Sequence, residues 1–433
     1  MTRWLYALVM WLAQPLVRRK LLRRAVQEPR YGHAVEQRFG HYDTVPALAS
    51  NAGAADGAGV QGSQSNAFVW VHAVSLGETR AAAVLVAGLR AQFPGMRLLL
   101  THGTATGWEQ GTALLQPGDV QTWQPWDTPA TVQRFLAHFR PRMGLLMETE
   151  VWPNMVAACR AAAVPLWLVN ARMSEKSMRQ ALRLRWLSRA AFAHLHGVLA
   201  QTEDDARRLR MLGATVHAVT GNLKFDATPD AALLERGRAW RAQCAQPVVM
   251  FTSSREGEEQ MFIDALRAAP THGVQWLIVP RHPQRFDAVA ELLQAAGFTV
   301  SRRSVWQGAP QAAGVWLGDS LGEMALYYGM ADVALLGGSF APLGGQNLIE
   351  AAACACPVLM GPHTFNFAQA ADMAEVEGAA LRCADMADAV RKAAALVSDA
   401  ASLARTREAA LAWSVAHRGA TQRTLQALGA GTA

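Results

Sequence analysis

The chain has 433 residues, of which 51% are hydrophobic and 17% charged, so it contains enough apolar side chains for two separate cores. Its formal net charge is +7, but eight Lys or Arg and two Glu in residues 1–42 carry +6 of it, which suits a membrane surface and argues against nucleic-acid binding by a folded domain. The five cysteines include no CxxC pair, and their odd number is typical of reduced thiols rather than of a disulfide framework or a metal site.

The first predicted element is an apolar segment from Trp4 to Val17, followed directly by five cations: Arg18, Arg19, Lys20, Arg23 and Arg24. A perpendicular span needs about 20 apolar residues, and a signal peptide carries its charges before the apolar run rather than after it. We therefore predict that residues 1–24 form an uncleaved membrane anchor that spans the bilayer or lies in its interface, with the rest of the chain cytoplasmic. The alternative is an amphipathic helix that packs on its own domain.

Beyond a stretch at 43–66 that is rich in Ala, Gly, Ser and Asn, and is predicted to be a flexible insertion, strands and helices alternate. The strand-like segments of the first half are FVWVHAV, RLLLTH, MGLLMETE, PLWLVNAR, GVLAQT and VHAVTGN, and those of the second half are VVMFTSS, WLIVP, VWLGDS, VALLGGS and PVLMG. Short, continuously apolar strands between helices predict parallel sheets covered on both faces. We expect two Rossmann-like α/β domains, at 25–228 and 229–433, with ligands at the carboxyl ends of the strands.

In the first domain, charged residues follow several predicted strands. The motif HAVSLGE contains Ser75, Gly77 and Glu78, and a carboxylate there can remove a proton from an incoming hydroxyl group. The alternative for Glu78 is a first-turn residue that interacts with the helix dipole. Further along, METEVWPN supplies Glu148, and the ends of two later strands supply Arg172 and Lys224, cations that suit an anionic ligand.

In the second domain, residues 331–362 predict a nucleotide site, because an apolar strand runs into paired glycines and then into a helix that begins at Asn347. A plain glycine-rich connection is the alternative reading. The candidate ligand contacts at the ends of the predicted strands are Ser254, Arg255, Pro280, Arg281, Leu321, Gly322, Glu323, Gly338, Ser339, Asn347, Leu348, Ile349 and Glu350. The chain has no G-x-G-x-x-G fingerprint and no P-loop, which argues against dehydrogenases and NTPases.

Eight motifs in this order, HAVSLGE, METEVWPN, NARMSEKS, TGNLKFD, FTSSREGEE, PRHPQRF, GDSLGEM and GGSFAPLGGQNLIEAA, resemble those of the 3-deoxy-D-manno-octulosonic acid (Kdo) transferases of Gram-negative bacteria. The resemblance covers essentially the whole chain apart from 43–66. It implies an inverting GT-B glycosyltransferase, with two Rossmann-like domains facing a cleft, on the cytoplasmic face of the inner membrane. Its implied partners are the donor CMP-Kdo, the acceptor lipid IVA (the lipid A precursor) and the membrane lipid surface, with no nucleic acid, cofactor or metal.

The resemblance also implies roles for individual positions. Glu78 matches the base that deprotonates the acceptor hydroxyl, while Glu148 and Lys224 match positions that support the transition state. Segments 280–281, 321–323 and 347–350 match the CMP-binding segments, with Glu350 as a ribose ligand. Two alternatives remain open at this point: a GT-B transferase that uses a UDP-sugar, and a non-catalytic, membrane-anchored nucleotide-binding protein. The three candidate catalytic residues argue against the second.

Overall fold

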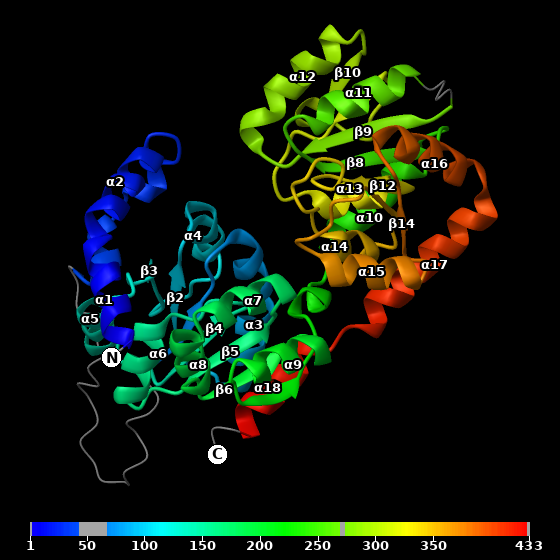
Figure 1. The fold of residues 1–433 in the computed structure, drawn as a ribbon. Coiled ribbons are helices and arrows are strands. Elements are labelled where there is room, and N and C mark those ends of the chain that lie inside the picture. The colour runs from blue at the N-terminus through cyan, green and yellow to red at the C-terminus, as the bar shows by residue number, and fades with distance from the viewer. Residues whose placement is uncertain (1, 43–66, 269–272, 431–433) are drawn as a thin grey trace, which may run out of the picture. The chain divides into compact units, whose positions relative to one another are not determined.

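The computed structural model describes residues 2–42, 67–268 and 273–430, so the predicted insertion at 43–66 lies outside the described residues. The chain forms two compact units (Figure 1): Met1–Asp226 together with Gly419–Ala433, and Ala227–Arg418. The sequence analysis placed all of 229–433 in one domain. This placement is wrong for the last residues, because the C-terminal helix packs on the first unit.

The first unit contains a seven-stranded parallel sheet. Across the sheet the strands are β3 (Val120–Trp123), β2 (Arg97–His102), β1 (Phe68–His72), β4 (Met143–Met147), β5 (Leu166–Ala171), β6 (Gly197–Ala200) and β7 (Val216–Val219). The helices of this unit are α1 (Thr2–Leu12), α2 (Gln14–Ala25), α3 (Leu76–Gln92), α4 (Ala105–Thr112), α5 (Pro129–Phe139), α6 (Pro153–Ala161), α7 (Glu175–Arg183), α8 (Arg185–Ala193), α9 (Glu203–Met211) and α18 (Ala420–Ala430).

Both faces of this sheet are buried, as its continuously apolar strands predict. Successive side chains of a strand point to opposite faces: Trp70 of β1 packs in a core with α5, α6 and α9, whereas Val69 and Val71 pack in a second core with α3 and α18. The helix α18, red in Figure 1, contacts α3 there. It is held by Asp226, whose carboxylate accepts hydrogen bonds from the N–H groups of Gly419 and Thr421 at 2.6 and 2.5 Å.

The second unit repeats this architecture with another seven-stranded parallel sheet. Its strands are, in spatial order, β10 (Val300–Arg302), β11 (Val315–Leu317), β9 (Gln275–Pro280), β8 (Val248–Ser254), β12 (Val333–Leu336), β13 (Val358–Met360) and β14 (Ala380–Arg382). Its helices are α10 (Ala231–Arg241), α11 (Glu258–Ala268), α12 (Phe286–Ala295), α13 (Met324–Met330), α14 (Leu348–Ala353), α15 (Ala368–Val376), α16 (Met386–Ser398) and α17 (Ala400–Ala416).

The N-terminal segment forms two helices that are docked on the first unit. Tyr6 donates a hydrogen bond to the Asp127 carboxylate at 2.9 Å, and the Trp126 indole donates to the Met10 carbonyl at 2.8 Å. The other side of α1 exposes large apolar side chains, including Trp4 (69% exposed) and Trp11 (61%). Within the ranges that the structure describes, no helix combines the length and the apolar character required to cross a bilayer.

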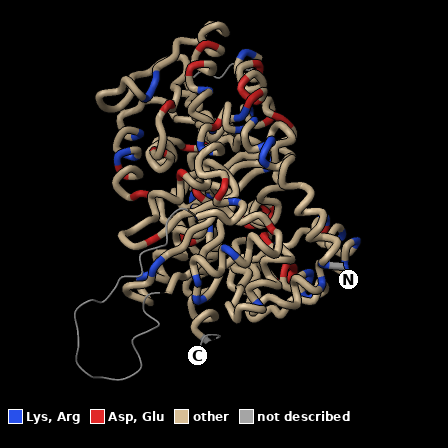
Figure 2. Tube along the Cα trace, turned by 90° about the vertical axis from the view of Figure 1, so that its left-hand side faces the viewer, with Lys and Arg blue, Asp and Glu red and all other residues tan. Residues whose placement is uncertain are grey.

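Beyond the basic N-terminal segment, positive and negative residues are mixed along the chain. Figure 2 shows Lys and Arg positions (blue) interspersed with Asp and Glu positions (red) along the traced chain. Many of them are paired locally, as in the ion pairs Arg179–Glu175 and Arg238–Glu235.

Candidate active site

The predicted site residues of each unit gather where the strand order of its sheet reverses. In the first sheet β1 lies between β2 and β4, and in the second β8 lies between β9 and β12. Connections leave such neighbouring strands toward opposite faces, which opens a ligand crevice at their carboxyl ends. Glu78 follows β1 and Glu148 follows β4, while Arg255 follows β8 and Gly338 follows β12. Both predicted clusters therefore lie at a position that is typical of ligand binding in this type of sheet.

Glu78 lies in the first turn of α3 and closes a reciprocal cap with Ser75. The Ser75 hydroxyl accepts a hydrogen bond from the Glu78 N–H at 3.4 Å and donates one to a Glu78 carboxylate oxygen at 2.9 Å. The other carboxylate oxygen accepts the Val74 N–H at 2.9 Å. This pattern orients the side chain rigidly. Gly77, by contrast, is exposed and would have open space beside a Cβ atom.

The pKa of Glu78 is raised to about 7. Burial is the largest cause, and the negative charges of Glu148 and Glu150 act in the same direction, against the hydrogen bonds from Val74 and Ser75. A carboxylate whose pKa lies near the working pH is suited to accept a proton from a hydroxyl group. Glu78 is therefore a first-turn residue of α3, as the alternative reading of the sequence held. Its electrostatic environment also suits a base.

Glu148 and Lys224 form a half-buried ion pair next to Glu78. The Lys224 ammonium donates a hydrogen bond to Glu148 at 2.8 Å, and the two side chains are only 15% and 12% exposed. Arg172 approaches the other carboxylate oxygen of Glu148 at 3.9 Å and is more exposed, at 39%. The structure therefore brings together three predicted residues that come from different strand ends, Glu148, Arg172 and Lys224.

Asn170 fixes the backbone beside Lys224 at the candidate site, and the sequence analysis did not single it out. It is fully buried at the end of β5, has a left-handed φ of 52°, and accepts the Leu223 N–H with its side-chain oxygen at 3.0 Å. Leu223 precedes Lys224 in a short 3-10 helix, so this bond fixes the backbone that carries the lysine. Asn tolerates left-handed backbone better than most residues, which was the one signal available in the sequence.

Glu258 is a second residue that sequence reasoning missed, and it organises the glycine loop of the other unit. Its fully buried carboxylate accepts hydrogen bonds from the N–H groups of Gly338 (2.7 Å), Phe340 (3.0 Å), Ala341 (3.2 Å) and Arg255 (3.1 Å). Gly338 has a φ of 72°, a backbone conformation that favours glycine. The backbone of the loop is therefore held by hydrogen bonds to the Glu258 carboxylate of α11.

Ser339, Gly338 and Ser254 were predicted to contact the substrate, and in the structure their polar groups form bonds within the unit. Ser339 is fully buried, and its hydroxyl group donates to the Leu336 carbonyl at 2.5 Å and accepts the Gly361 N–H at 2.8 Å. The N–H of Gly338 already points to Glu258. The hydroxyl group of Ser254 is also buried and donates to Glu259 at 3.2 Å. These bonds engage the three residues within the unit, and their contact with the substrate stays a prediction.

Cations gather beside this loop at the carboxyl ends of β8 and β9. The Arg281 N–H donates to the Ser254 carbonyl at 3.0 Å, which ties the two strand ends together, while Pro280 is buried. Burial lowers the pKa of His282, and so do the positive charges of its neighbours Arg255, Arg281 and Arg285. Arg285 is also paired with Glu259 at 3.3 Å and with Glu256 at 3.8 Å, so part of its charge is compensated. The guanidinium groups around His282 still make a positive region that suits a phosphate.

In segment 321–323 the backbone is accessible to a ligand, whereas the Glu323 carboxylate is bonded to other residues of the unit. Leu321 is 72% exposed and Gly322 has a φ of 78°. Burial alone would raise the pKa of Glu323, but hydrogen bonds from Ser320 and Arg303, with the charge of Arg236, hold it below its usual value. That carboxylate is therefore already engaged within the unit.

The segment 347–350 opens α14. The Asn347 side chain accepts the Ile349 N–H at 3.2 Å as an N-cap. Leu348 and Ile349 are buried (1% exposed each), so they can meet a ligand only through their backbone, whereas Glu350 is partly exposed. Burial raises the pKa of the Tyr328 phenol, and the negative charge of Glu350 raises it further. Across the described part of the chain, no three His, Cys, Asp or Glu side chains are placed to hold a metal ion.

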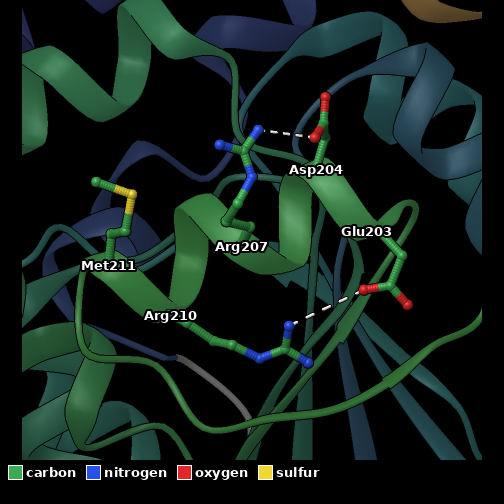
Figure 3. Close-up of a pocket in the computed structure, with 5 residues that line it drawn as sticks. All are labelled: Glu203, Asp204, Arg207, Arg210 and Met211. Atoms are coloured by element: carbon green, nitrogen blue, oxygen red, sulfur yellow. Dashed lines mark hydrogen bonds and ion pairs between the residues drawn. The ribbon is translucent and has the colours of Figure 1, made fainter.

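A surface hollow on α9 does not belong to this site. Figure 3 shows Arg207 directed at Asp204 and Arg210 directed at Glu203, and the two ion pairs measure 2.7 and 4.0 Å. None of the predicted site residues lines this hollow, which also contains Met211. Its charges neutralise one another within a single helix.

Comparisons with known proteins show which family this chain resembles. Residues 33–227 match the family described as 3-Deoxy-D-manno-octulosonic-acid transferase (kdotransferase). A 3-deoxy-D-manno-octulosonic acid transferase from Bordetella pertussis is 52% identical over 371 residues, which cover 83% of this chain and 86% of that protein. Another, from Haemophilus influenzae, is 32% identical over a match that covers 99% of this chain and 98% of that protein.

The crystal structure of a glycosyltransferase from Rickettsia africae is similar to this chain with a TM-score of 0.56 and 11% identity, covering 84% of this chain and 98% of that chain, which shows a shared fold. The fold class predicted from the sequence, two Rossmann-like parallel-sheet domains of the GT-B type, is thereby confirmed. With relatives of high identity matched over most of its length, the chain belongs to the family of 3-deoxy-D-manno-octulosonic acid transferases and is a glycosyltransferase.

Proposed function

We propose that this enzyme moves Kdo from CMP-Kdo onto a hydroxyl group of lipid IVA, with Glu78 as the general base. The observation that carries this proposal is the environment of Glu78: a carboxylate with a pKa of about 7, held by Val74 and Ser75 at a sheet switch point. In the proposed reaction Glu78 accepts the hydroxyl proton while the acceptor oxygen bonds to the anomeric carbon of Kdo. The bond between that carbon and the CMP phosphate oxygen breaks, and CMP leaves with its electron pair.

The Glu148–Lys224 pair supports this role electrostatically. Lys224 neutralises Glu148, so that Glu78 can still ionise near neutral pH despite two neighbouring carboxylates. Arg172 adds a second positive charge on the same carboxylate. We propose that this group of charges also stabilises the transition state as the proton moves to Glu78.

Donor binding is proposed for the second unit. Segments 280–281, 321–323 and 347–350 would hold CMP, with Glu350 on the ribose. The positive region formed by Arg255, Arg281 and Arg285 would stabilise the charge that develops on the departing phosphate. Because the proposed donor contacts are carried by one unit and the proposed base by the other, transfer needs both units.

The site of action is also a proposal. The apolar, exposed side of α1 and the cations of α2 suit the interface of an anionic membrane, and the lipid acceptor resides in such a membrane. We place the enzyme on the cytoplasmic face of the inner membrane, with α1 and α2 as its anchor.

The test is a reaction of the full chain with CMP-Kdo and lipid IVA in neutral detergent. We expect release of CMP and a lipid product heavier by one or more Kdo residues in mass spectrometry. Thermal shifts with CMP and with UDP provide a separate check on the donor. Folded protein that releases no CMP above the blank, or that is stabilised by UDP and not by CMP, would refute the proposal.

A further inference from the structure

A pocket of about 310 Å³ lies in the first unit between α2 and the carboxyl ends of β1, β2 and β3. Val74, Gly103 and Gln124, which follow these three strands, form its floor, and Lys20, Leu21 and Arg24 of α2 form its opposite wall. The pocket is distinct from the proposed donor site, because all of its lining residues belong to the first unit.

Arg38, which lines this pocket, is an almost fully buried cation without a carboxylate partner. Its side chain is 8% exposed; one terminal nitrogen donates to the Gly103 carbonyl at 3.1 Å, and the guanidinium lies 3.8 Å from the centre of the Trp123 ring. Its Nε atom has no hydrogen-bond partner, and no ion pair forms with any carboxylate of the described chain. A buried charge of this kind is unfavourable unless an anion neutralises it.

The other walls combine cations with apolar surface. Lys20 and Arg24 are exposed at the rim, whereas Leu21 and Phe39 are buried beside it. One carboxylate, Asp127, also lines the pocket, but its oxygens already accept hydrogen bonds from Tyr6 and from the N–H groups at the start of α6. The pocket therefore offers three positive charges and an apolar wall to one ligand, which fits an anionic amphiphile.

Two residues that line the pocket bond to the proposed base Glu78 and to Glu150, a carboxylate whose charge acts on Glu78. The Val74 N–H bonds to Glu78 at 2.9 Å, and the Trp152 indole donates to Glu150 at 2.8 Å. A molecule seated in the pocket would therefore lie next to the proposed base. This adjacency links the pocket to the acceptor rather than to an unrelated ligand.

We propose that this pocket binds a phosphate monoester of the acylated acceptor lipid on Arg38, Lys20 and Arg24, and so positions the acceptor hydroxyl for Glu78. The inference rests on the proposed function, since lipid IVA carries both phosphate and acyl groups. Arg38 supplies the buried contact and the two α2 cations close over the phosphate. They are positioning residues, because they act on a group remote from the reacting hydroxyl.

The test measures binding of the full chain to lipid IVA, and to the same lipid lacking one phosphate, in neutral detergent micelles. For the wild type, loss of the recognised phosphate should weaken binding about 10- to 100-fold, the usual effect of a charge-assisted hydrogen bond. In Arg38→Gln, and in the double variant Lys20→Gln/Arg24→Gln, this penalty should shrink to less than about threefold. The second variant alters only exposed side chains and so guards against a folding defect in the first.

Matched controls separate the pocket from general surface charge. Arg19→Gln/Arg23→Gln removes two equally exposed cations of the same helix that do not line the pocket, and it should keep the full phosphate penalty. Inorganic phosphate and phosphatidylglycerol in micelles should compete at least tenfold more weakly than lipid IVA. A penalty retained in both pocket variants, or competition by either probe at the same concentration, would overturn the inference.

Lipid binding tests the pocket, and Kdo transfer tests the proposed function. If the wild type binds lipid IVA with the expected phosphate penalty but transfers no Kdo, the proposed function fails and the pocket stands as a phospholipid site. If transfer occurs and the penalty is unaffected by the pocket variants, the pocket inference fails alone.

Discussion

At position 78, opposing influences act on one carboxylate. Burial and the charges of Glu148 and Glu150 raise its pKa, the hydrogen bonds from Val74 and Ser75 lower it, and the balance is a value of about 7. A base works only when deprotonated, so kcat/KM should fall about tenfold for each pH unit below 7 and level off above it. A pH profile of transfer measures this limb, and an activity that stays constant between pH 5 and 8 would contradict it.

Replacing this carboxylate tests its role directly. Glu78→Gln keeps the shape but cannot accept the proton, so we expect transfer to fall by about 10²- to 10⁴-fold with the CMP dissociation constant unchanged. Turnover assays and calorimetric CMP titration measure the two effects. Glu109→Gln, an exposed glutamate on α4, serves as the control and should retain activity. Equal turnover in the two variants would remove Glu78 from the role of base.

Lys224 should influence the acidic part of the pH profile through its ion pair with Glu148. In Lys224→Met, Glu148 loses the cation at 2.8 Å and keeps Arg172 at 3.9 Å, so its charge is less well compensated. This loss costs about 2–3 kcal/mol of unfolding free energy and makes Glu78 harder to ionise. Because more negative charge raises the pKa of an acid, the limb should move to higher pH. Arg179→Met breaks an exposed pair with Glu175 and should change neither quantity. If the acidic part of the pH profile does not move in Lys224→Met, the Glu148–Lys224 pair does not influence the pKa of Glu78.

How far the sequence could predict these residues depends on their distance along the chain. Glu78, Glu148 and Lys224 were predictable because each follows an apolar strand, and parallel strands end at one edge. Asn170 was not, because its partner Leu223 lies on another strand connection and the bond depends on one left-handed residue. Glu258 is a first-turn acid of α11, and nothing in the local sequence shows that it faces Gly338.

At the scale of elements, the glycine loop after β12 depends on α11. Glu258→Gln replaces one acceptor oxygen by an amide that faces backbone N–H donors, so we expect a loss of about 3 kcal/mol of unfolding free energy and a weaker affinity for CMP. Chemical denaturation and CMP titration measure both. Asp264→Asn on the exposed side of α11 is the control and should change neither. If Glu258→Gln is less stable but binds CMP with unchanged affinity, the glycine loop does not contribute to donor binding.

The return of α18 to the first unit could not be predicted from periodicity, because an amphipathic helix does not indicate which core it covers. Its attachment depends on Asp226, which accepts two N–H groups at the start of the helix. Asp226→Ala should cost about 1–2 kcal/mol and accelerate amide hydrogen exchange in 420–430. In Asp230→Ala, which removes the cap of α10, faster exchange should be confined to α10. Protected 420–430 in Asp226→Ala would refute this attachment.

At the scale of the whole molecule, the two sheets share a plan that the alternation of apolar strands and helices was sufficient to predict. Each has its first strand, β1 or β8, next to the position where the strand order reverses. Hydrophobic periodicity does not show where a helix lies when its apolar side chains face outward rather than the core. The N-terminal segment is such a case, because α1 packs through Tyr6 and Met10 while its larger apolar side chains remain exposed.

That arrangement gives a test of membrane attachment that leaves the docking of α1 intact. Trp4→Gln/Trp11→Gln removes two exposed aromatic side chains, each worth about 1.5–3 kcal/mol when buried in an apolar phase, so binding to vesicles that contain anionic lipid should fall by at least tenfold. Sedimentation with vesicles measures this, and CMP affinity should not change. Trp186→Gln, on α8 and 42% exposed, is the matched control and should bind vesicles normally. If the control loses as much binding as the double variant, attachment is a property of exposed tryptophan in general and α1 is not the anchor.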